Sequence, residues 1–432
     1  MDFTKIYKEK LMAPMEIAEQ IQDNWVCGMD IAAGIPTGLA NVIAEAAKQD
    51  KFKNVNMHTL LDITKIDFLQ EGYEENIRPT SWFSGGGLRQ AVNDGRADLM
   101  PGYYRDWPSL IEDFVDFDAI FLHVSPMDKH GYFSMSLAGS VSQALLDKTK
   151  RIYLQVNEKM PRALTSPLIH ISDVTGLCEI NEDLPIFPPA KIDETSETIA
   201  KYISDLIPDG ATIQLGIGAI PEAVGYGLKD KKDLGIHTEL LTDAMVELIE
   251  CGAVTNMKKP IHKGKTVATL AFGSQRMYDY IDDNRSFELL TVDYVNDPTV
   301  IAKHPNFISI NGALEVDFFG QAAAESLGTK HISGSGGQAD YVRGAFMSDG
   351  GKSFIALPST AAGGKVSRIR PTLSEGAIVT THKNDVDYIV TEYGAVRLKG
   401  KTLKQRTEAL ISIARPDFRE ELTEEAKKRN IL

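Results

Sequence analysis

The stretch ATIQLGIGAIPEAVGYGLKD, at residues 211–230, decides the fold class. Its first part, ATIQLGIG, is an apolar run that suits a buried strand, and AIPEAVGYGLKD supplies turn residues followed by helical spacing. The preceding stretch TSETIAKYISDLIPDG (195–210) also has a helical pattern. Because strands that alternate with helices build parallel sheets with covered faces, the chain is predicted to be an α/β protein.

The same order of patterns occurs in the first half of the chain. PMEIAEQIQD (14–23) has helical spacing, WVCGMDIAAG (25–34) suits a strand, and IPTGLANVIAEAAKQD (35–50) is a helix pattern. VNMHTLL (55–61) also resembles GIHTELL (235–241), from which it differs by one inserted residue, Glu239. The repetition predicts two similar domains, each with an open parallel sheet.

A segment rich in proline and acidic residues separates the two halves at residues 178–197. It has no sustained period, which is typical of a linker. We therefore predict an N-terminal α/β domain at residues 1–185 and a C-terminal α/β domain at residues 186–432. The C-terminus is predicted to be a surface helix, with Asp417 as its N-cap after Pro416.

Charge and composition exclude several classes of protein. Lys plus Arg (46) against Asp plus Glu (60) gives a net charge of −14, which disfavours general binding to nucleic acid or to an anionic membrane. The three cysteines (27, 178 and 251) have neither zinc-site nor redox-motif spacing, and we predict that they are buried in a reducing compartment. No run of 18 apolar residues and no signal segment occurs, so a cytoplasmic protein without a metal site is expected.

The glycine turn GIGAIP (216–221) follows a strand and opens a helix, so its backbone N–H groups could bind an anion or a developing oxyanion. A dinucleotide fingerprint is the competing interpretation, with Glu239 as the acidic ribose ligand. Pro221 occupies the position of the third glycine and disfavours that interpretation. A third alternative is a turn with no ligand.

Four further features suggest chemistry. Glu239 follows a short predicted strand, Gly235 to His237, at the carboxyl edge of a parallel sheet. SGSGGQADYVRGA (333–345) after a predicted strand at 329–332 would expose several N–H groups, unless it is only a flexible linker. STAAGGKVSRIRP (359–371) carries the best phosphate-binding patch of the chain, unless its cations are only solvated. Asn311, at a strand end, could donate to an oxyanion or only satisfy a turn.

Aromatic side chains of the first half offer an acyl pocket or simply a packed core. They are Trp82, Phe83, Tyr103 and Tyr104. Large aromatic residues more often pack in cores, so we favour the core for most of them.

These motifs together resemble the acetyl-CoA hydrolase/transferase family of class I CoA-transferases, within it the butyryl-CoA:acetate and 4-hydroxybutyrate CoA-transferases. The resemblance rests on LGIGAIPEAV, LGIHTELLTDAMVEL, SGSGGQADYVRGA and TEYGAVRLKGKTLKQRTEALISIARPDF. It covers essentially the whole chain. It implies a duplicated CoA-transferase-like fold, acyl-CoA and short-chain carboxylic acids as substrates, no cofactor beyond coenzyme A itself, and a homodimer or dimer of dimers.

The resemblance also assigns site residues. The glutamate that becomes a glutamyl-CoA thioester matches Glu239, and Asn311 would help to hold the oxyanion. The residues that would bind CoA are Gly216, Ile217, Gly218, Ala219, Ile220, Leu314, Gly334, Gly336, Gly337, Gly364 and Lys365. A covalent, ping-pong CoA transfer follows from this assignment. The alternatives are an acyl-CoA hydrolase that uses the same glutamate, a nicotinamide-dependent oxidoreductase and a non-catalytic ligand-binding protein.

Overall fold

The computed structural model describes residues 2–432 and divides into two compact units. Unit 1 comprises residues 1–187 and 267–295, and unit 2 comprises residues 188–266 and 296–432. The first division, between Phe187 and Pro188, falls two residues from the predicted boundary. The prediction of one continuous second domain is wrong, because residues 267–295 belong to unit 1.

Backbone hydrogen bonds explain why residues 267–295 join unit 1. The carbonyl of Thr269 accepts from the backbone N–H groups of Gly139 and Ser140 at 2.9 and 3.0 Å, and the N–H of Phe187 donates to Gly273 at 3.0 Å. The rings of Phe187 and Phe272 also pack edge to face, with centroids 5.2 Å apart. Contacts between residues so distant in the chain leave no periodic pattern in the sequence.

Unit 1 is built on a parallel sheet, as predicted. The strand order is β4 (Asp98–Leu99), β3 (Ile77–Ser81), β2 (Val55–Thr59), β1 (Val26–Met29), β5 (Ala119–Val124), β7 (Ile152–Val156), β9 (Gly176–Glu179). The helices are α1 (Phe3–Lys10), α2 (Pro14–Ala18), α3 (Thr37–Lys48), α4 (Gly86–Asn93), α5 (Trp107–Phe114), α6 (Ser142–Lys148), α10 (Gln275–Ile281) and α11 (Val292–Val295). Short strands are β6 (Tyr132–Ser134), β8 (Leu168–His170), β13 (Thr266–Ala268), β14 (Leu270–Ala271) and β15 (Phe287–Leu289).

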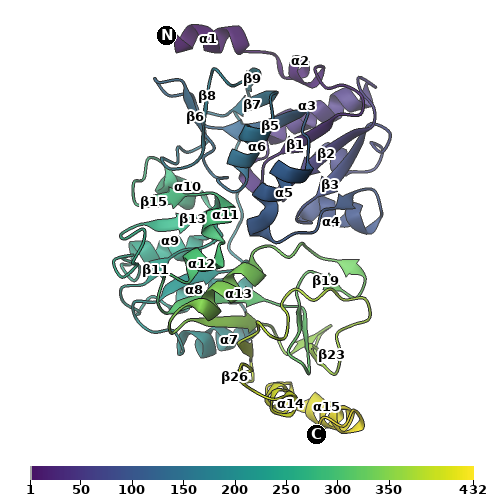
Figure 1. The fold of residues 1–432 in the computed structure, drawn as a ribbon, viewed down its shortest axis with the longest axis vertical. Helices are drawn as coiled ribbons and strands as arrows, with labels where there is room; N and C mark the ends of the chain where they lie inside the picture. The colour runs from purple at the N-terminus through teal and green to yellow at the C-terminus, as the bar shows by residue number, and fades with distance from the viewer. Residues whose placement is uncertain (1) are drawn as a thin grey trace. The chain divides into compact units, whose positions relative to one another are not determined.

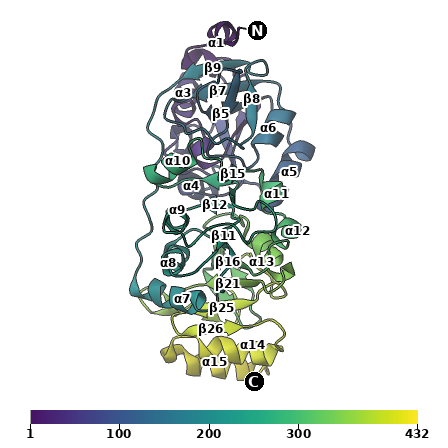
Figure 2. The same cartoon turned by 90° about the vertical axis from the view of Figure 1, so that its left-hand side faces the viewer.

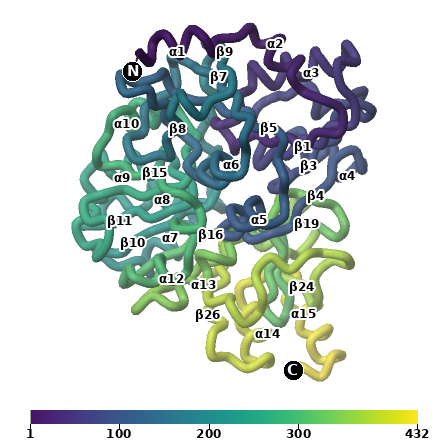
Figure 3. The backbone as a smooth tube through the Cα atoms, turned by 45° about the horizontal axis from the view of Figure 1, so that its top comes forward, coloured from purple at the N-terminus to yellow at the C-terminus, as the bar shows by residue number. Residues whose placement is uncertain are grey.

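The core of unit 1 lies between the sheet and the helices α2 and α3, which pack against each other (Figure 1). α3 presents Leu39, Ile43 and Ala47 to the sheet because these apolar residues recur every three to four positions. The predicted helix at 14–23 is shorter than expected and ends at Ala18. α1 runs beside β9 and β7, as the tube in Figure 3 shows, and Tyr7 of α1 donates to Glu179 of β9 at 2.7 Å.

Unit 2 repeats this plan. Its sheet has the order β11 (Gly235–Ile236), β10 (Thr212–Leu215), β16 (Phe307–Gly312), β21 (Lys352–Ala356), β25 (Tyr388–Thr391), β26 (Gly394–Arg397). All neighbouring strands are parallel except β25 and β26. The order β11-β10-β16-β21-β25 corresponds to β2-β1-β5-β7-β9 of unit 1, so the predicted pair of similar parallel-sheet domains is confirmed.

The helices of unit 2 are α7 (Glu194–Ser204), α8 (Ala219–Gly227), α9 (Asp243–Glu250), α12 (Pro298–Ile301), α13 (Gln338–Met347), α14 (Leu403–Ser412) and α15 (Pro416–Lys428). Short strands are β12 (Leu240–Leu241), β17 (Glu315–Asp317), β18 (Ala322–Ala323), β19 (Ser326–Leu327), β20 (Lys330–His331), β22 (Thr360–Ala361), β23 (Val366–Ser367) and β24 (Ile369–Arg370). α14 and α15 pack side by side next to β26 (Figure 2).

Three local predictions need correction. The N-cap of α15 is Arg415, and Asp417 lies inside the first turn, because Pro416 occupies the first helical position that suits its fixed φ angle. Cys251 is exposed after the end of α9, whereas Cys27 and Cys178 are buried in strands as expected. The predicted strand at 329–332 is only the two-residue β20, which pairs antiparallel with β19 outside the main sheet.

Candidate active site

The carboxyl ends of three strands meet at one edge of the unit 2 sheet. Thr212 and Ile213 of β10 lie in register with Gly235 and Ile236 of β11, and Leu215 at the end of β10 pairs with Ile310 of β16. The residues that follow these strands therefore emerge at the same edge, where open α/β sheets bind their ligands. The predicted site residues at positions 216, 239 and 311 all lie at or just after these strand ends.

Glu239 is partly exposed, although residues on both sides of it are buried. It follows β11 by three residues, after the fully buried His237 and Thr238. Burial raises the pKa of the Glu239 carboxyl to about 7, and hydrogen bonds from Asn296 and from the backbone of Gly337 act in the opposite direction. A carboxylate with this pKa is a stronger base and a better nucleophile than an exposed one.

Two donors hold the Glu239 carboxylate. The Nδ2 of Asn296 donates to its Oε2 at 2.9 Å, and the backbone N–H of Gly337 donates to the same carboxylate. Gly337 is the N-cap of α13, so the carboxylate also lies at the positive end of a helix. An ideal Cβ at position 337 would overlap Oε2, so only glycine permits this approach.

The glycine turn opens α8 as predicted. Gly218 has a φ of +123° and no atom within 4 Å of an ideal Cβ, so this backbone is strained for other residues and faces open space. Ile217 is 55% exposed, which is unusual for an isoleucine next to a parallel sheet. Ala219 and Ile220 form the first turn of α8. The turn thus offers an open, apolar rim with the start of a helix behind it.

Asn311 lies next to this turn. An ideal Cβ at Gly216 would approach its Oδ1 to 3.3 Å. The Nδ2 of Asn311 donates to Ser309 Oγ at 2.9 Å, and its Oδ1 accepts from Gln214 at 3.2 Å. This buried network fixes the amide, whose role towards an oxyanion stays a prediction.

The other predicted contacts are spread over unit 2. Gly336 and Gly337 are buried in the turn before α13, and Gly334 is partly exposed. The backbone N–H of Leu314 donates to Ala323 at 2.8 Å, so it is already engaged. Gly364 has a φ of +85° in the loop between β22 and β23, where Lys365 is exposed.

The predicted phosphate patch is smaller than the sequence indicates. Arg370 lies 3.5 Å from the buried carboxylate of Glu315, and Arg368 is partly buried, which lowers its pKa. Lys365 is the exposed cation of the three. Pairing with Glu315 reduces the charge that Arg370 offers to a phosphate.

In unit 1 the aromatic residues divide. Trp82 and Tyr104 are 2% exposed and pack against Trp107, as a core requires, whereas Phe83 is partly exposed and Tyr103 is 37% exposed.

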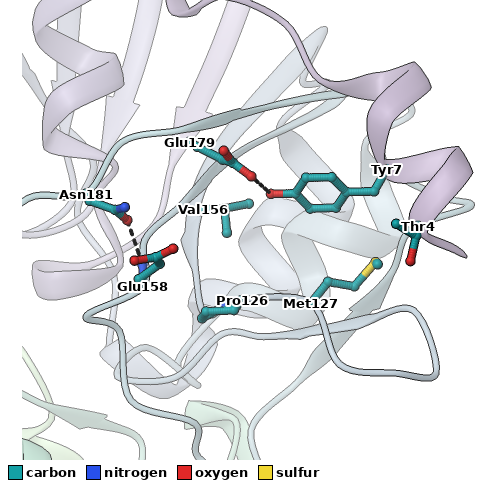
Figure 4. A pocket seen from close by; sticks show the side chains of 8 residues that line it. All are labelled: Thr4, Tyr7, Pro126, Met127, Val156, Glu158, Glu179 and Asn181. Carbon is teal, nitrogen blue, oxygen red and sulfur yellow. Dashed lines mark hydrogen bonds between the residues drawn. The ribbon is translucent and has the colours of Figure 1, made fainter.

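Unit 1 also has a pocket of about 260 Å³ beside α1. Figure 4 shows Tyr7 bonded to Glu179, and Asn181 bonded to the backbone of Glu158, along its wall. No predicted site residue lines this pocket.

The sequence reasoning missed Asn296. The residue lies in the turn Asn296-Asp297-Pro298 between two short helices, a context in which asparagine usually serves the turn itself. The available signal was weak, because Asn296 is 57 residues from Glu239 in the chain.

The described residues contain no helix long and apolar enough to cross a membrane. Within residues 2–432, no group of three or more His, Cys, Asp or Glu side chains is arranged to hold a metal ion.

Comparison with known proteins shows that the chain is an enzyme that transfers CoA. It is 43% identical over 430 residues to the 4-hydroxybutyrate coenzyme A transferase of Clostridium kluyveri, covering 99% of this chain and 100% of that protein. It is 38% identical over 448 residues to the butyryl-CoA:acetate CoA-transferase of Anaerostipes caccae, covering 100% and 99%. The crystal structure of RipA from Yersinia pestis matches with a TM-score of 0.95 and 38% identity over 100% of both chains.

The chain belongs to the acetyl-CoA hydrolase/transferase family. The family model of the N-terminal domain matches residues 1–188, and that of the C-terminal domain matches residues 273–426. Because the chain belongs to this family of enzymes, the nicotinamide-dependent oxidoreductase and the non-catalytic ligand-binding protein are set aside as interpretations.

Proposed function

We propose that this enzyme moves CoA between a short-chain acyl-CoA and a carboxylic acid, through a glutamyl-CoA thioester on Glu239. The butyrate, 4-hydroxybutyrate and acetate named for its relatives are the proposed substrate class. The observation that carries the mechanism is the position of Glu239, a partly exposed residue whose carboxylate is held by two donors at the carboxyl edge of a parallel sheet.

In the first half-reaction, a carboxylate oxygen of Glu239 attacks the acyl carbonyl. The C–S bond breaks, and a mixed anhydride and CoA thiolate form. The thiolate then attacks the Cδ of Glu239, the anhydride C–O bond breaks, and the first acid leaves as its carboxylate. The second half-reaction runs these steps backwards with the acceptor acid, so the kinetics are ping-pong.

Because one thioester replaces another, the proposed reaction needs no ATP, metal or redox cofactor. Its costly species are the tetrahedral intermediates, whose oxyanions need donors. One well-placed donor contributes about 3 kcal/mol to such a step. The backbone of 216–220, the loop at Gly334, Gly336 and Gly337, and the amide of Asn311 are the proposed donors and CoA-binding groups.

CoA itself would be bound partly away from the reacting carbon. Lys365, exposed near Gly364, is proposed to meet a phosphate of the nucleotide end, and the chain near Leu314 to contact CoA by groups other than its engaged N–H. Binding energy gained there would offset the cost of forming the anhydride. We further propose that the enzyme is a homodimer or a dimer of dimers and that it is cytoplasmic.

Hydrolysis of acyl-CoA is the second candidate, because the same glutamyl thioester breaks down if water reaches it. The partial exposure of Glu239 is the observation that keeps this reaction in view. The release of free CoA thiol in the absence of an acceptor acid measures the hydrolysis. A transferase gives exchange with acetate that exceeds thiol release.

The test of the proposal is incubation with butyryl-CoA alone, followed by peptide mass analysis. We expect a CoA adduct on Glu239, converted by borohydride to the reduced side chain, and no adduct in Glu239→Ala. A panel of carboxylic acids then defines the acceptors. Transfer activity that survives in folded Glu239→Ala would overturn the assignment.

A further inference from the structure

Asn296 is a fully buried side chain that serves Glu239 directly. It is 0% exposed, and its Nδ2 lies 2.9 Å from Glu239 Oε2. A carboxylate only accepts hydrogen bonds, so the amide must turn its NH₂ group towards Glu239. This orientation leaves Asn296 Oδ1 without a hydrogen-bond partner among residues 2–432. A buried amide oxygen without a partner costs free energy, which indicates that the hydrogen bond to Glu239 is what holds the amide in this orientation.

Oε2 is the carboxylate oxygen that accepts from Asn296 and lies against the backbone of Gly337. An ideal Cβ on Gly337 would overlap both Oε2 and Asn296 Nδ2, and it would lie 3.3 Å from Glu239 Cδ. The backbone of Gly337, whose N–H donates to the carboxylate, thus packs against the same oxygen as Asn296. α13, which begins at the next residue, is ten residues long and adds its dipole at this point.

We propose that Asn296 is a catalytic residue that stabilises negative charge on Oε2 of Glu239, while Oε1 is the oxygen that attacks the acyl group. This proposal rests on the proposed function. Asn296 Nδ2 and the Gly337 N–H together form an oxyanion hole for the glutamyl carbonyl. Asn311, whose amide is bonded to Ser309 and Gln214, is a separate donor.

The electron balance shows when this hole acts. In the mixed anhydride, Oε1 bridges Cδ to the acyl carbon, and Oε2 is a carbonyl oxygen. When CoA thiolate bonds to Cδ, the C=O electron pair moves onto Oε2, which becomes an oxyanion. Collapse of the intermediate restores C=Oε2, breaks the Cδ–Oε1 bond and releases the acyl carboxylate with Oε1. The acceptor acid passes through the same intermediate in reverse, so both half-reactions need the hole.

The first experiment measures formation of the Glu239 thioester by rapid quench with butyryl-CoA alone. Asn296→Leu keeps the number and branching of the side-chain heavy atoms and removes the donor, so we expect thioester formation and kcat to fall about 10²–10³-fold with little change in KM. Asn284→Ala is the matched control, because the amide of Asn284 donates to a helix carbonyl in unit 1 and does not touch Glu239. The control should react at the wild-type rate.

A second variant separates a donor from a merely space-filling residue. Asn296→Asp has the same shape, but its carboxyl donates only when protonated. The introduced carboxyl and Glu239 would then share one proton, because two adjacent carboxylates resist double ionisation. We expect the activity of this variant relative to wild type to rise at least about tenfold from pH 8 to pH 5.5.

The outcomes are distinct. Wild-type protein that forms no adduct refutes the proposed function itself. With a wild-type adduct, an Asn296→Leu rate within about threefold of wild type overturns the role of Asn296. If Asn296→Leu does not fold, Asn296→Asp decides, and an activity ratio that does not change with pH overturns the proposal.

Discussion

Asp62 in unit 1 and Glu239 in unit 2 occupy comparable places. Asp62 follows β2 and accepts from the N–H of Gly87 at 2.6 Å, in the first turn of α4. Glu239 follows β11, the strand that corresponds to β2, and accepts from the N–H of Gly337 at the start of α13. Each unit therefore sets a carboxylate against a glycine-rich helix start.

The two carboxylates differ in access. Asp62 is 2% exposed, and an ideal Cβ on Gly85 would overlap its backbone oxygen, so the chain closes over it. Glu239 is partly exposed and has the second donor, Asn296. Burial raises both pKa values, to about 6 for Asp62 and about 7 for Glu239. A perturbed pKa therefore does not separate a helix-capping acid from the proposed nucleophile, and the proposal rests on the partial exposure of residue 239 and on its second donor.

The largest expected effect tests this difference directly. Glu239→Gln keeps the shape and removes the nucleophile, so kcat should fall about 10⁵-fold or more. Asp62→Asn should leave kcat within about twofold and change only stability, by about 1 kcal/mol. Steady-state transfer assays measure kcat, and thermal unfolding measures stability, for the two variants. A comparable loss of kcat in folded Asp62→Asn would mean that unit 1 takes part in the chemistry.

The paired glycines give the next largest effect. In Gly337→Ala the new methyl would collide with Glu239 Oε2, and the displaced carboxylate should lower kcat about 10²-fold. In Gly87→Ala the methyl would meet Asp62 and Leu69 at an ordinary 3.5 Å. That variant should keep full activity and gain about 0.5 kcal/mol, because alanine favours the helix. Equal activity of the two variants would contradict the close contact at Gly337.

The pH profile should report the Glu239 pKa of about 7. Only the ionised carboxylate attacks, so kcat/KM for acyl-CoA should rise with pH and be about tenfold lower at pH 6 than at pH 8. Loss of the Asn296 donor should move the rise of kcat/KM to higher pH, because the hydrogen bond from Asn296 favours the ionised form of Glu239. A limb centred near pH 4.5 would show that substrate sees a well-solvated carboxylate.

The smallest effect on activity is expected at Asp30, which follows β1 where unit 2 has Gly216 after β10. Asp30 is 0% exposed, and burial raises its pKa to about 7 although Ser142 donates to it. The folded protein binds the proton more tightly than the unfolded chain, so this group stabilises the fold at low pH. That stabilisation is lost as the pH rises from about 4 to about 7.

The Asp30→Asn variant has no ionisable side chain at this position, so its stability does not fall in this way as the pH rises. The free energy of unfolding of the variant relative to wild type should therefore increase by about 3 kcal/mol between pH 4 and pH 7. Denaturant unfolding at both pH values measures the difference. A difference that is constant with pH would mean that Asp30 remains ionised in the folded protein.

Much of the fold could be predicted from local patterns. The apolar runs at 119–125, 151–157, 307–312 and 353–359 contain most or all of β5, β7, β16 and β21, and the repeat predicted two related sheets. The return of residues 267–295 to unit 1 could not be predicted, because it depends on backbone hydrogen bonds such as that from Gly139 to Thr269. The exposure of Cys251 was missed for a similar reason, since it depends on where α9 ends.

The sequence by itself determined the duplicated α/β plan, the glycine loops and the one acidic residue by which the second repeat exceeds the first, since periodicity and insertions are local and readable. Only the tertiary structure decided that Asn296 and Gly337 hold that acid, and that Arg370 is paired with Glu315. These contacts join residues far apart in the chain, and their strength depends on burial, a property that exists only once the chain has folded.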